Sequence, residues 1–409
     1  MSRALVTGIG IISPLGPDRE TTWQAVKEGR SAANVLHDIA LTGQRIHIGA
    51  QVDRSWLDGA DAHRDPFIRF ALKAAAEAVA DAKIPLSDMD RSRIGCFIGS
   101  SKGGVATVHE EQARLLRGEP PTGRLFSDFP PNMASVAVWE RHSLAGPCGN
   151  IVAACATGAL CIAHAAAMIE EGACDIVLAG ASDASMTPAI IAGFDKMRLL
   201  ARSNGDPKAA ARPFDRDRSG FILGEGACVL VVESEDHARR RGARSYGAIT
   251  GWASTSQAHA MTHHDPSGAG ITEALTTALR RGAIAPKDIG YINAHGTGTQ
   301  QNDIVETTAI RNAFGDAADR IPVSSTKPVT GHLLGAAGSI EFAIALLAMR
   351  DGFLPPTINL DHPDPACDLD YVPKVGRPAA IQNCLSISSG LGGQVCVLIA
   401  SRAKFTLDT

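Results

Sequence analysis

The sequence predicts an α/β fold made of two duplicated halves. Short apolar runs typical of buried strands alternate with longer segments typical of helices, and this alternation favours parallel strands between helical layers. The second half of the chain repeats the first in outline, which indicates an internal duplication. At 409 residues, the chain also exceeds the size that one hydrophobic core usually serves.

The first half begins with a strand at residues 4–8 that breaks into a glycine-rich turn ending at Gly16. We reject a nucleotide-binding turn here, because the third glycine is out of place and no acidic partner follows at the required distance. The next predicted elements are a helix at 20–28, an amphipathic helix at 67–82, strands at 93–100 and 174–180, and an Ala-rich helix at 159–172.

The second half echoes these elements in the same order. The predicted equivalents are a strand at 246–251, a helix at 270–282, a strand at 288–293, a strand at 322–325 in the place of 151–154, a helix at 336–349, and a closing strand at 395–400 that matches the one at Ile176. We therefore divide the chain into an N-terminal half, residues 1–245, and a C-terminal half, residues 246–409. Residues 118–131 are rich in Pro and Gly and are expected to form loops that line the substrate site or contact a partner subunit.

Bulk composition excludes several classes of function. The formal net charge of -4 and the isoelectric point near 6.4 provide no basic surface for nucleic acid. Nine cysteines without a C-x-x-C pair fit neither a disulfide framework nor a structural zinc site, so we expect a reducing, cytoplasmic location. We see no signal-peptide pattern, and no apolar run approaches the roughly 20 residues of a membrane span.

Cys155 is the residue around which the chemistry is organised. It follows the apolar run 151–154, is flanked by small residues, and precedes the Ala-rich helix. A cysteine at the positive end of a helix is stabilised as a thiolate. A free cysteine alone is more often a small core residue, so the neighbouring motifs must decide between the two interpretations.

Three further stretches supply those motifs. His295 ends a predicted strand and is followed by glycines and the hydroxyls of Thr297 and Thr299. Lys327 and His332 lie in a stretch too apolar for solvent, and burying them costs desolvation, which argues for function. The glycine-rich turn at 390–393 precedes the last strand, and its N–H groups are suited to an oxyanion. The adjacent histidines at 263 and 264 have no partner set at metal-ligand spacing, so we predict no metal.

Together these motifs resemble those of the elongating β-ketoacyl-acyl-carrier-protein synthases of the thiolase superfamily. Residues 212–227 and the acidic pair Asp303 and Glu306 support the match, which extends over residues 4–399. The resemblance implies a thiolase-like, five-layered αβαβα fold and an acyltransferase that performs a decarboxylative Claisen condensation in fatty-acid or polyketide synthesis. It implies an acyl carrier protein as partner, substrates carried on phosphopantetheine, no cofactor, and a dimer.

The resemblance also assigns roles to residues. Cys155 would carry the acyl chain, His295 and His332 would donate N–H bonds to the enolate oxygen, and the backbone N–H groups of Cys155 and Leu391 would form the oxyanion hole. Lys327 would organise the histidines electrostatically. The remaining assigned residues are Asp303, Glu306 and Glu341 as supports of that arrangement, and Thr297, Thr299, Gly390, Leu391, Gly392 and Lys102 as pantetheine or substrate contacts.

Three positions depart from the family pattern. Leu391 stands where the family has a gating phenylalanine, and Lys102 stands in a place that resembles the apolar lining of the acyl pocket. A charge in such a pocket is costly unless it finds a partner. Residues 300–302 replace the more usual Pro-Leu-Gly. These changes suggest a specialised polyketide or polyene ketosynthase.

Two alternatives stay open at this point. The chain could be the active subunit of a heterodimer with a chain-length-factor-like homologue, in which Lys102 could find its partner. It could also be a thiolase or another CoA-dependent acyltransferase, although residues 390–393 lack the second cysteine that thiolases use as base. The presence of Cys155 argues against the chain being the inactive chain-length partner itself.

Overall fold

One continuous sheet of ten strands runs through the computed structural model, which describes residues 2–39, 41, 43–57, 59–86, 89–203 and 205–403. The strand order across it is β10-β9-β13-β14-β8-β1-β7-β6-β4-β5. Its strands are β1 (Ala4–Ile12), β4 (Ile94–Gly99), β5 (Cys148–Gly149), β6 (Ile176–Asp183), β7 (Gly226–Ser234), β8 (Gly247–Ser256), β9 (Tyr291–Asn293), β10 (Val323–Ser324), β13 (Asn383–Ser389) and β14 (Gln394–Ser401). Two small sheets pair β2 (Asn34–Val35) with β3 (Ile48–Gly49), and β11 (Phe353–Leu354) with β12 (Arg377–Pro378).

Both halves of the sheet have the same topology. Outward from the junction of β1 and β8, the first half runs β1, β7, β6, β4, β5 and the second runs β8, β14, β13, β9, β10. The junction itself is short and antiparallel, from the pair Ala4 and Ile249 to the pair Val6 and Gly247. The predicted duplication of the fold is therefore visible in the strand order, while the boundary between residues 245 and 246 stays a prediction.

Two expectations about the sheet were wrong. The sheet is mixed, because β7 pairs antiparallel with β1 and β6, and β14 pairs antiparallel with β8 and β13. Only the outer strands pair parallel, as β4 does with β5 and β6. The closing strand β14 occupies the position of β7, so β13 is the equivalent of β6. Strand β13 was not predicted from the sequence, because Ser386, Ser388 and Ser389 interrupt its apolar pattern.

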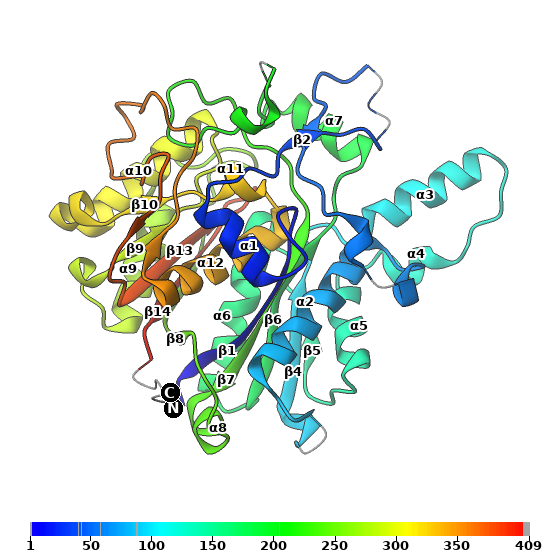
Figure 1. Ribbon diagram of the computed structural model, residues 1–409, viewed down its shortest axis with the longest axis horizontal. Helices are drawn as coiled ribbons and strands as arrows, with labels where there is room; N and C mark the ends of the chain where they lie inside the picture. The colour runs from blue at the N-terminus through cyan, green and yellow to red at the C-terminus, as the bar shows by residue number, and fades with distance from the viewer. Residues whose placement is uncertain are drawn as a thin grey trace.

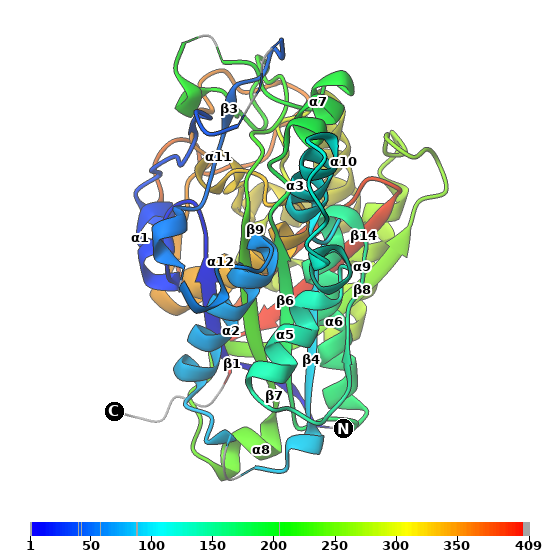
Figure 2. The same cartoon turned by 90° about the vertical axis from the view of Figure 1, so that its right-hand side faces the viewer.

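Helices cover both outer faces of the sheet and fill the space between its halves (Figures 1 and 2). They are α1 (Arg19–Lys27), α2 (Pro66–Ala82), α3 (Val105–Leu116), α4 (Arg124–Asp128), α5 (Met133–Arg141), α6 (Thr157–Glu170), α7 (Pro188–Lys196), α8 (Glu235–Arg240), α9 (Ala269–Gly282), α10 (Gln300–Phe314), α11 (Lys327–Thr330) and α12 (Ala337–Asp351). Helices α2 and α5 pack on the outside of the first half, and α9 packs with α10 outside the second. The fold therefore has five αβαβα layers. The outer helical layers contain α2 and α9, the central layer contains α6 and α12, and the strands of one half lie on each side of that central layer.

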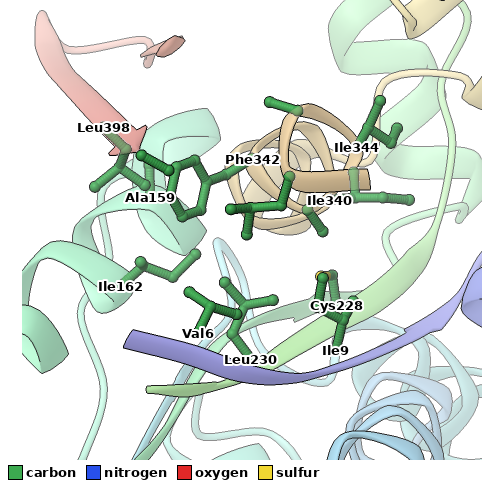
Figure 3. Close-up of a cluster of buried hydrophobic side chains, with 14 of the residues drawn as sticks. Val6, Ile9, Ala159, Ile162, Cys228, Leu230, Ile340, Phe342, Ile344 and Leu398 are labelled. Atoms are coloured by element: carbon green, nitrogen blue, oxygen red, sulfur yellow. The ribbon is translucent and has the colours of Figure 1, made fainter. Parts of the chain in front are cut away.

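The central layer exists because α6 and α12 are apolar on nearly every side. Every residue of α12 from Ala337 to Met349 is buried, which is the pattern of a helix enclosed by other elements. Ile162 of α6 and Phe342 of α12 join a core with Val6 and Leu230 of the first half and Leu398 of the second (Figure 3). The two halves therefore share this central core, and a further cluster of buried residues lies in each half.

Matching sharp turns lead into these two central helices. A 3-10 turn at Ala154–Ala156 precedes α6, and another at Leu334–Ala336 precedes α12. The first residue of each turn has a positive φ, 47° at Ala154 and 49° at Leu334. Residues with a side chain rarely adopt this conformation, so the surrounding structure must hold it. The residues that follow, Cys155 and Gly335, occupy equivalent positions.

An arm formed by α3 and α4 projects from the first half (Figure 1). Residues 118–131 were expected to be loops, yet they contain α4, and α3 precedes them. The arm exposes large apolar side chains, with Leu116 82% and Phe126 85% exposed. None of the helices in the described part of the chain combines the length and apolar character that a membrane span requires.

Candidate active site

Cys155 lies at the start of α6, on the strained turn that follows Ala153. The Thr157 hydroxyl holds this turn, because it accepts a hydrogen bond from Ala153 N at 2.9 Å and donates one to Ala154 O at 2.8 Å. The helix begins at Thr157, two residues earlier than predicted, so Cys155 is closer to the helix start than the sequence suggested. Its side chain is buried and lines a cavity of about 250 Å³.

His332 lies within hydrogen-bonding distance of the cysteine. Its Nε2 lies 3.1 Å from Cys155 Sγ. The backbone on either side is fixed by an extended segment of the first half, since His332 N donates to Ile222 O at 2.7 Å and Gly224 N donates to His332 O at 2.9 Å. Phe221 packs edge-on against the imidazole, with ring centroids 4.8 Å apart. The ring is therefore positioned by residues from both halves.

His295 completes the group at the end of β9. Its ring lies 5.6 Å from that of His332, centroid to centroid, and both rings line the cavity. Glu306 of α10 holds the backbone, because its carboxylate accepts from His295 N at 2.6 Å and Gly296 N at 2.8 Å. Nδ1 of His295 faces the ammonium of Lys327 at 3.4 Å. A protonated lysine can only donate to it, so the ring proton resides on Nε2.

Lys327 is buried below the histidines and ion-paired. Its ammonium donates to Glu341 of α12 at 2.5 Å and to the His295 carbonyl oxygen. The carboxylate offsets the charge of an ammonium that is 1% exposed. This arrangement fits the predicted organising role of Lys327.

No hydrogen bond or ion pair joins Asp303 or Glu306 to Lys327 among the described residues, although the positive charge of Lys327 lowers the pKa of Glu306. Asp303 accepts from Phe214 N at 2.8 Å and Gly298 N at 3.1 Å, and lies 3.7 Å from the guanidinium of Arg218. Both carboxylates therefore support the backbone of the loop that carries His295. Burial raises the pKa of Glu306 to about 7, and the two backbone donors oppose that rise.

Burial determines the charge state of the site. It holds the pKa of His295 and of His332 well below the usual value, and the positive charge of Lys327 lowers both further. Both imidazoles are therefore neutral at physiological pH. Burial also raises the pKa of Glu341 to about 7, against the effect of the Lys327 ammonium.

The thiol of Cys155 differs from the sequence-based expectation of a stabilised thiolate. Burial raises its pKa to about 11, and the positive charges of Lys102 and Lys327 oppose that rise. The negative charges of Asp183 and Glu341 add to it. The resting group is therefore a thiol, because desolvation outweighs the helix N-terminus.

The predicted oxyanion donors lie next to each other. The turn between β13 and β14 packs on the nucleophile turn so closely that a Cβ at Gly390 would be 3.3 Å from Cys155 N and 2.7 Å from Ala153 O. Within the described residues, the N–H groups of Cys155 and Leu391 have no hydrogen-bond partner. Two free backbone donors at one cavity wall are suited to a developing negative charge on oxygen.

Most of the residues predicted to contact pantetheine or substrate line the cavity. Thr297 and Thr299 line it, with hydroxyls 3.0 Å apart, and so do Gly390 and Leu391. Gly392 lies instead in a smaller neighbouring space, where its N–H donates to Met261 O at 2.8 Å. Lys102 is not among the residues that line the cavity with Cys155.

Several lining residues were not predicted from the sequence. Phe194 and Phe221 form an apolar wall, with ring centroids 5.6 Å apart. His264, considered above only as a metal ligand, also lines the cavity. The segments that deliver these residues are distant in the chain, and no local pattern marks them.

Donor atoms of Cys155, His295 and His332 all lie within 4.8 Å of one another. The ammonium of Lys327 beside His295 opposes a further cation here. In the described chain, Asp215, Asp217 and His362 form another group of this kind, of which two members are exposed. We assign no metal to either group.

This arrangement is suited to acyl transfer. A thiol at a helix start can attack a carbonyl carbon, two backbone N–H groups can bind the resulting oxyanion, and two neutral imidazoles can donate to a second oxygen. Such a site can form a thioester and stabilise an enolate.

Comparisons with known proteins agree with this chemistry. Residues 1–238 match the family described as beta-ketoacyl synthase, N-terminal domain, and residues 246–361 match its C-terminal domain. The 3-oxoacyl-[acyl-carrier-protein] synthase 2 of Coxiella burnetii is 40% identical over 98% of both chains. A ketosynthase solved with its type II polyketide synthase acyl-carrier protein and a hexaketide has a TM-score of 0.91 at 33% identity and covers 98% of this chain and 100% of its own. The ishigamide ketosynthase/chain length factor also has a TM-score of 0.91, at 29% identity over 98% of this chain and 99% of its own.

Proposed function

The chain belongs to the β-ketoacyl synthase family, and from this premise we propose that it condenses an acyl chain held on Cys155 with malonyl-acyl-carrier protein. The products are a β-ketoacyl-acyl-carrier protein and CO₂. The observation that carries the proposal is the 3.1 Å approach of His332 Nε2 to Cys155 Sγ, beside a second neutral histidine.

The first half-reaction loads the enzyme. The sulfur of Cys155 attacks the thioester carbon of an acyl chain carried on phosphopantetheine. The N–H groups of Cys155 and Leu391 bind the oxyanion of the tetrahedral intermediate. The bond from carbon to the pantetheine sulfur then breaks, the pantetheine leaves as a thiol, and the acyl chain remains on Cys155.

The second half-reaction makes the carbon–carbon bond. Malonyl thioester loses CO₂, and the electrons of the broken bond form an enolate whose oxygen accepts N–H bonds from His295 and His332. The enolate carbon attacks the acyl thioester on Cys155 and releases the thiolate. Lys327 fixes the tautomer of His295, so that its Nε2–H faces the cavity.

The nucleophile assignment is tested by paired substitutions. Cys155→Ala should abolish loading of a radiolabelled acyl chain from its carrier protein. Cys161→Ala should load normally, because Cys161 lies in the same helix, is fully buried and does not line the cavity. Equal loading of the two variants would overturn the assignment.

The decarboxylation roles are tested separately. His332→Ala should still transfer the acyl chain to Cys155 but should release CO₂ from malonyl-acyl-carrier protein about 10²–10³-fold more slowly, the usual effect of removing one such donor. Unchanged CO₂ release would remove His332 from the mechanism.

Partner subunits are the second part of the proposal. Strand β5 ends the sheet with an exposed Cys148, and the arm of α3 and α4 in the same half exposes Leu116 and Phe126. An open sheet edge and large exposed apolar side chains each indicate subunit contacts. We propose a dimer through this face, with either a second copy or a chain-length-factor-like homologue. The likeness to the ishigamide ketosynthase/chain length factor supports the second possibility.

A CoA-dependent thiolase is the less favoured alternative. The turn at 390–393 contains no cysteine that could act as the second base, and no other cysteine of the described residues lines the cavity. The proposed steps need no metal or organic cofactor beyond the pantetheine of the substrates. A cytoplasmic location agrees with nine free cysteines.

A further inference from the structure

Three polar side chains that line the cavity each have an atom without a hydrogen-bond partner in the described part of the chain. They are Ser389 at the end of β13, Asn302 near the start of α10, and His264 in the loop between β8 and α9. The atoms concerned are Ser389 Oγ, Asn302 Oδ1 and His264 Nδ1. Ser389 is 2% and Asn302 is 4% exposed, so bulk solvent does not pair with their side chains. A buried polar atom left unpaired costs free energy, and a ligand that pairs with it recovers that cost.

Ser389 and Asn302 flank the same glycine of the loop that carries His295. Glu306 Oε2 accepts from Gly296 N at 2.8 Å and from Asn302 Nδ2 at 3.4 Å, so Asn302 lies beside Gly296. The parallel register of β13 and β9, continued by three residues, brings Ser389 level with Gly296 as well. The two unpaired atoms therefore belong to one part of the cavity wall.

The loop that carries His264 is attached to the same part of the wall. Its backbone accepts a hydrogen bond at the His264 carbonyl oxygen from Gln301 Nε2 at 3.1 Å, directly before Asn302 in the chain. Gly392 N, three residues after Ser389, donates to an oxygen of the same loop at 2.8 Å. Residues 260–264 and 390–393 also enclose one small space together. The three side chains thus form a cluster rather than separate positions.

The cluster offers both donors and an acceptor. Asn302 Nδ2 also donates to Asp303 Oδ1 at 3.2 Å, and since its two partners are carboxylates, the free Oδ1 can only be an acceptor. Burial lowers the pKa of His264, and the neighbouring His263 lowers it further, so the neutral ring has one N–H donor and one acceptor. The Ser389 hydroxyl can donate or accept. A carboxylate or a ketone only accepts, whereas a hydroxyl or a secondary amide matches all of these partners.

We propose that Ser389, Asn302 and His264 form a subsite for a substrate group that both donates and accepts hydrogen bonds. This inference rests on the proposed function, in which acyl thioesters of phosphopantetheine enter the cavity. Two parts of such substrates have this chemistry, namely a secondary amide of the pantetheine arm and a hydroxyl on the acyl chain. A substrate without such a group leaves the three atoms unpaired and is disfavoured.

The test compares three thioesters that differ only in these groups. Hexanoyl-N-acetylcysteamine contains a secondary amide, hexanoyl-pentanethiol has two methylenes in its place, and 3-hydroxyhexanoyl-pentanethiol adds a hydroxyl on the acyl side. Mass spectrometry of the acylated protein gives kcat/KM for the loading of Cys155 by each. The wild type should prefer one of the two group-bearing thioesters to hexanoyl-pentanethiol by about tenfold. The preferred thioester identifies whether the arm or the chain supplies the group.

Ser389→Ala should reduce this preference to about twofold or less, and His264→Leu should do the same. The melting temperature of Ser389→Ala should not fall, because its hydroxyl has no partner in the described protein. Ser388→Ala is the matched control. It removes the adjacent hydroxyl, which is equally buried and also lacks a partner but does not line the cavity, and it should keep the wild-type preference.

A wild type that shows no preference would overturn the inference, and so would either variant that retains it. A Ser389→Ala enzyme with a lower melting temperature and equally slower loading from all three thioesters would also overturn it, because the hydroxyl would then support the fold. Failure of the proposed function is distinguishable, since none of the thioesters would then acylate Cys155.

Discussion

Lys327 shows how one residue connects stability and chemistry. Its ammonium is fully enclosed, and the carboxylate of Glu341 compensates its positive charge. Glu341→Ala should lower the free energy of unfolding by about 3–5 kcal/mol, because it leaves a buried charge without a partner. Urea denaturation measures this loss.

The double variant Lys327→Met with Glu341→Met is the control for that prediction. It should recover much of the lost stability, since it removes both charges together. It should nonetheless lack condensing activity, because His295 loses the donor that fixes its tautomer. A single variant as stable as the wild type would show that the ion pair contributes nothing.

The two half-reactions should respond differently to pH. Because the pKa of the Cys155 thiol is about 11, the thiolate fraction and the rate of acyl loading should rise about tenfold per pH unit between pH 6 and 9. CO₂ release by Cys155→Ala should stay nearly constant between pH 6 and 8, because both histidines remain neutral there. A fall in CO₂ release below pH 7 that persisted in Glu341→Gln would contradict the neutral histidines, because the pKa of Glu341 itself is about 7.

At the scale of elements, the close approach of α6 and α12 positions the nucleophile. A Cβ at Gly338 would be 3.0 Å from Ala159 N and 2.6 Å from Ser388 Oγ, and one at Gly158 would be 2.8 Å from Ser339 N. Gly338→Val should therefore destabilise the protein by about 1–3 kcal/mol and slow acyl loading, because overpacking displaces the start of α6. Thermal unfolding and loading assays measure both effects.

Gly193→Ala serves as its control. A Cβ at this position of α7 meets nothing within 4 Å, so stability should be unchanged or slightly higher. If Gly338→Val behaved in the same way, the contact between the two helices would not be tight.

The predicted elements show what local pattern can and cannot supply. The amphipathic spacing of α2 predicted it to within one residue. In the structure Asp65 caps its start and Lys83 ends it in a left-handed conformation. The serine-containing strand β13 and the weakly amphipathic helix α10 carry no such signal, since tertiary packing determines them.

The site divides in the same way. Cys155, His295, Lys327 and His332 were recognised from motifs and are brought together by the fold. The acid–base state of Cys155 was misjudged, because local sequence shows a helix start but not the burial that opposes it. The aromatic wall of Phe194 and Phe221 arises from segments that meet only in the folded chain.

At the scale of the whole molecule, the arm and the sheet edge predict association. A variant carrying both Leu116→Glu and Phe126→Glu should shift the protein from dimer to monomer in light scattering, because charges on an apolar contact face cannot be desolvated. Val375→Glu should remain dimeric, since Val375 is 76% exposed and does not belong to the arm. A dimer unaffected by the double substitution would place the interface elsewhere.

The two matching turns before α6 and α12 determine how many acyl groups one chain can hold. Duplication supplied two equivalent elbows, yet the second carries Gly335, where a Cβ would lie 2.6 Å from Ser101 N and 2.8 Å from an Asp183 oxygen. The space beside Gly335 is therefore occupied, and this second turn cannot hold a nucleophilic side chain. We therefore expect a stoichiometry of one acyl group per chain, with the second half contributing His295 and His332 to the site at Cys155. The two halves of the fold thus form one site between them, with Cys155 from the first half and both histidines from the second.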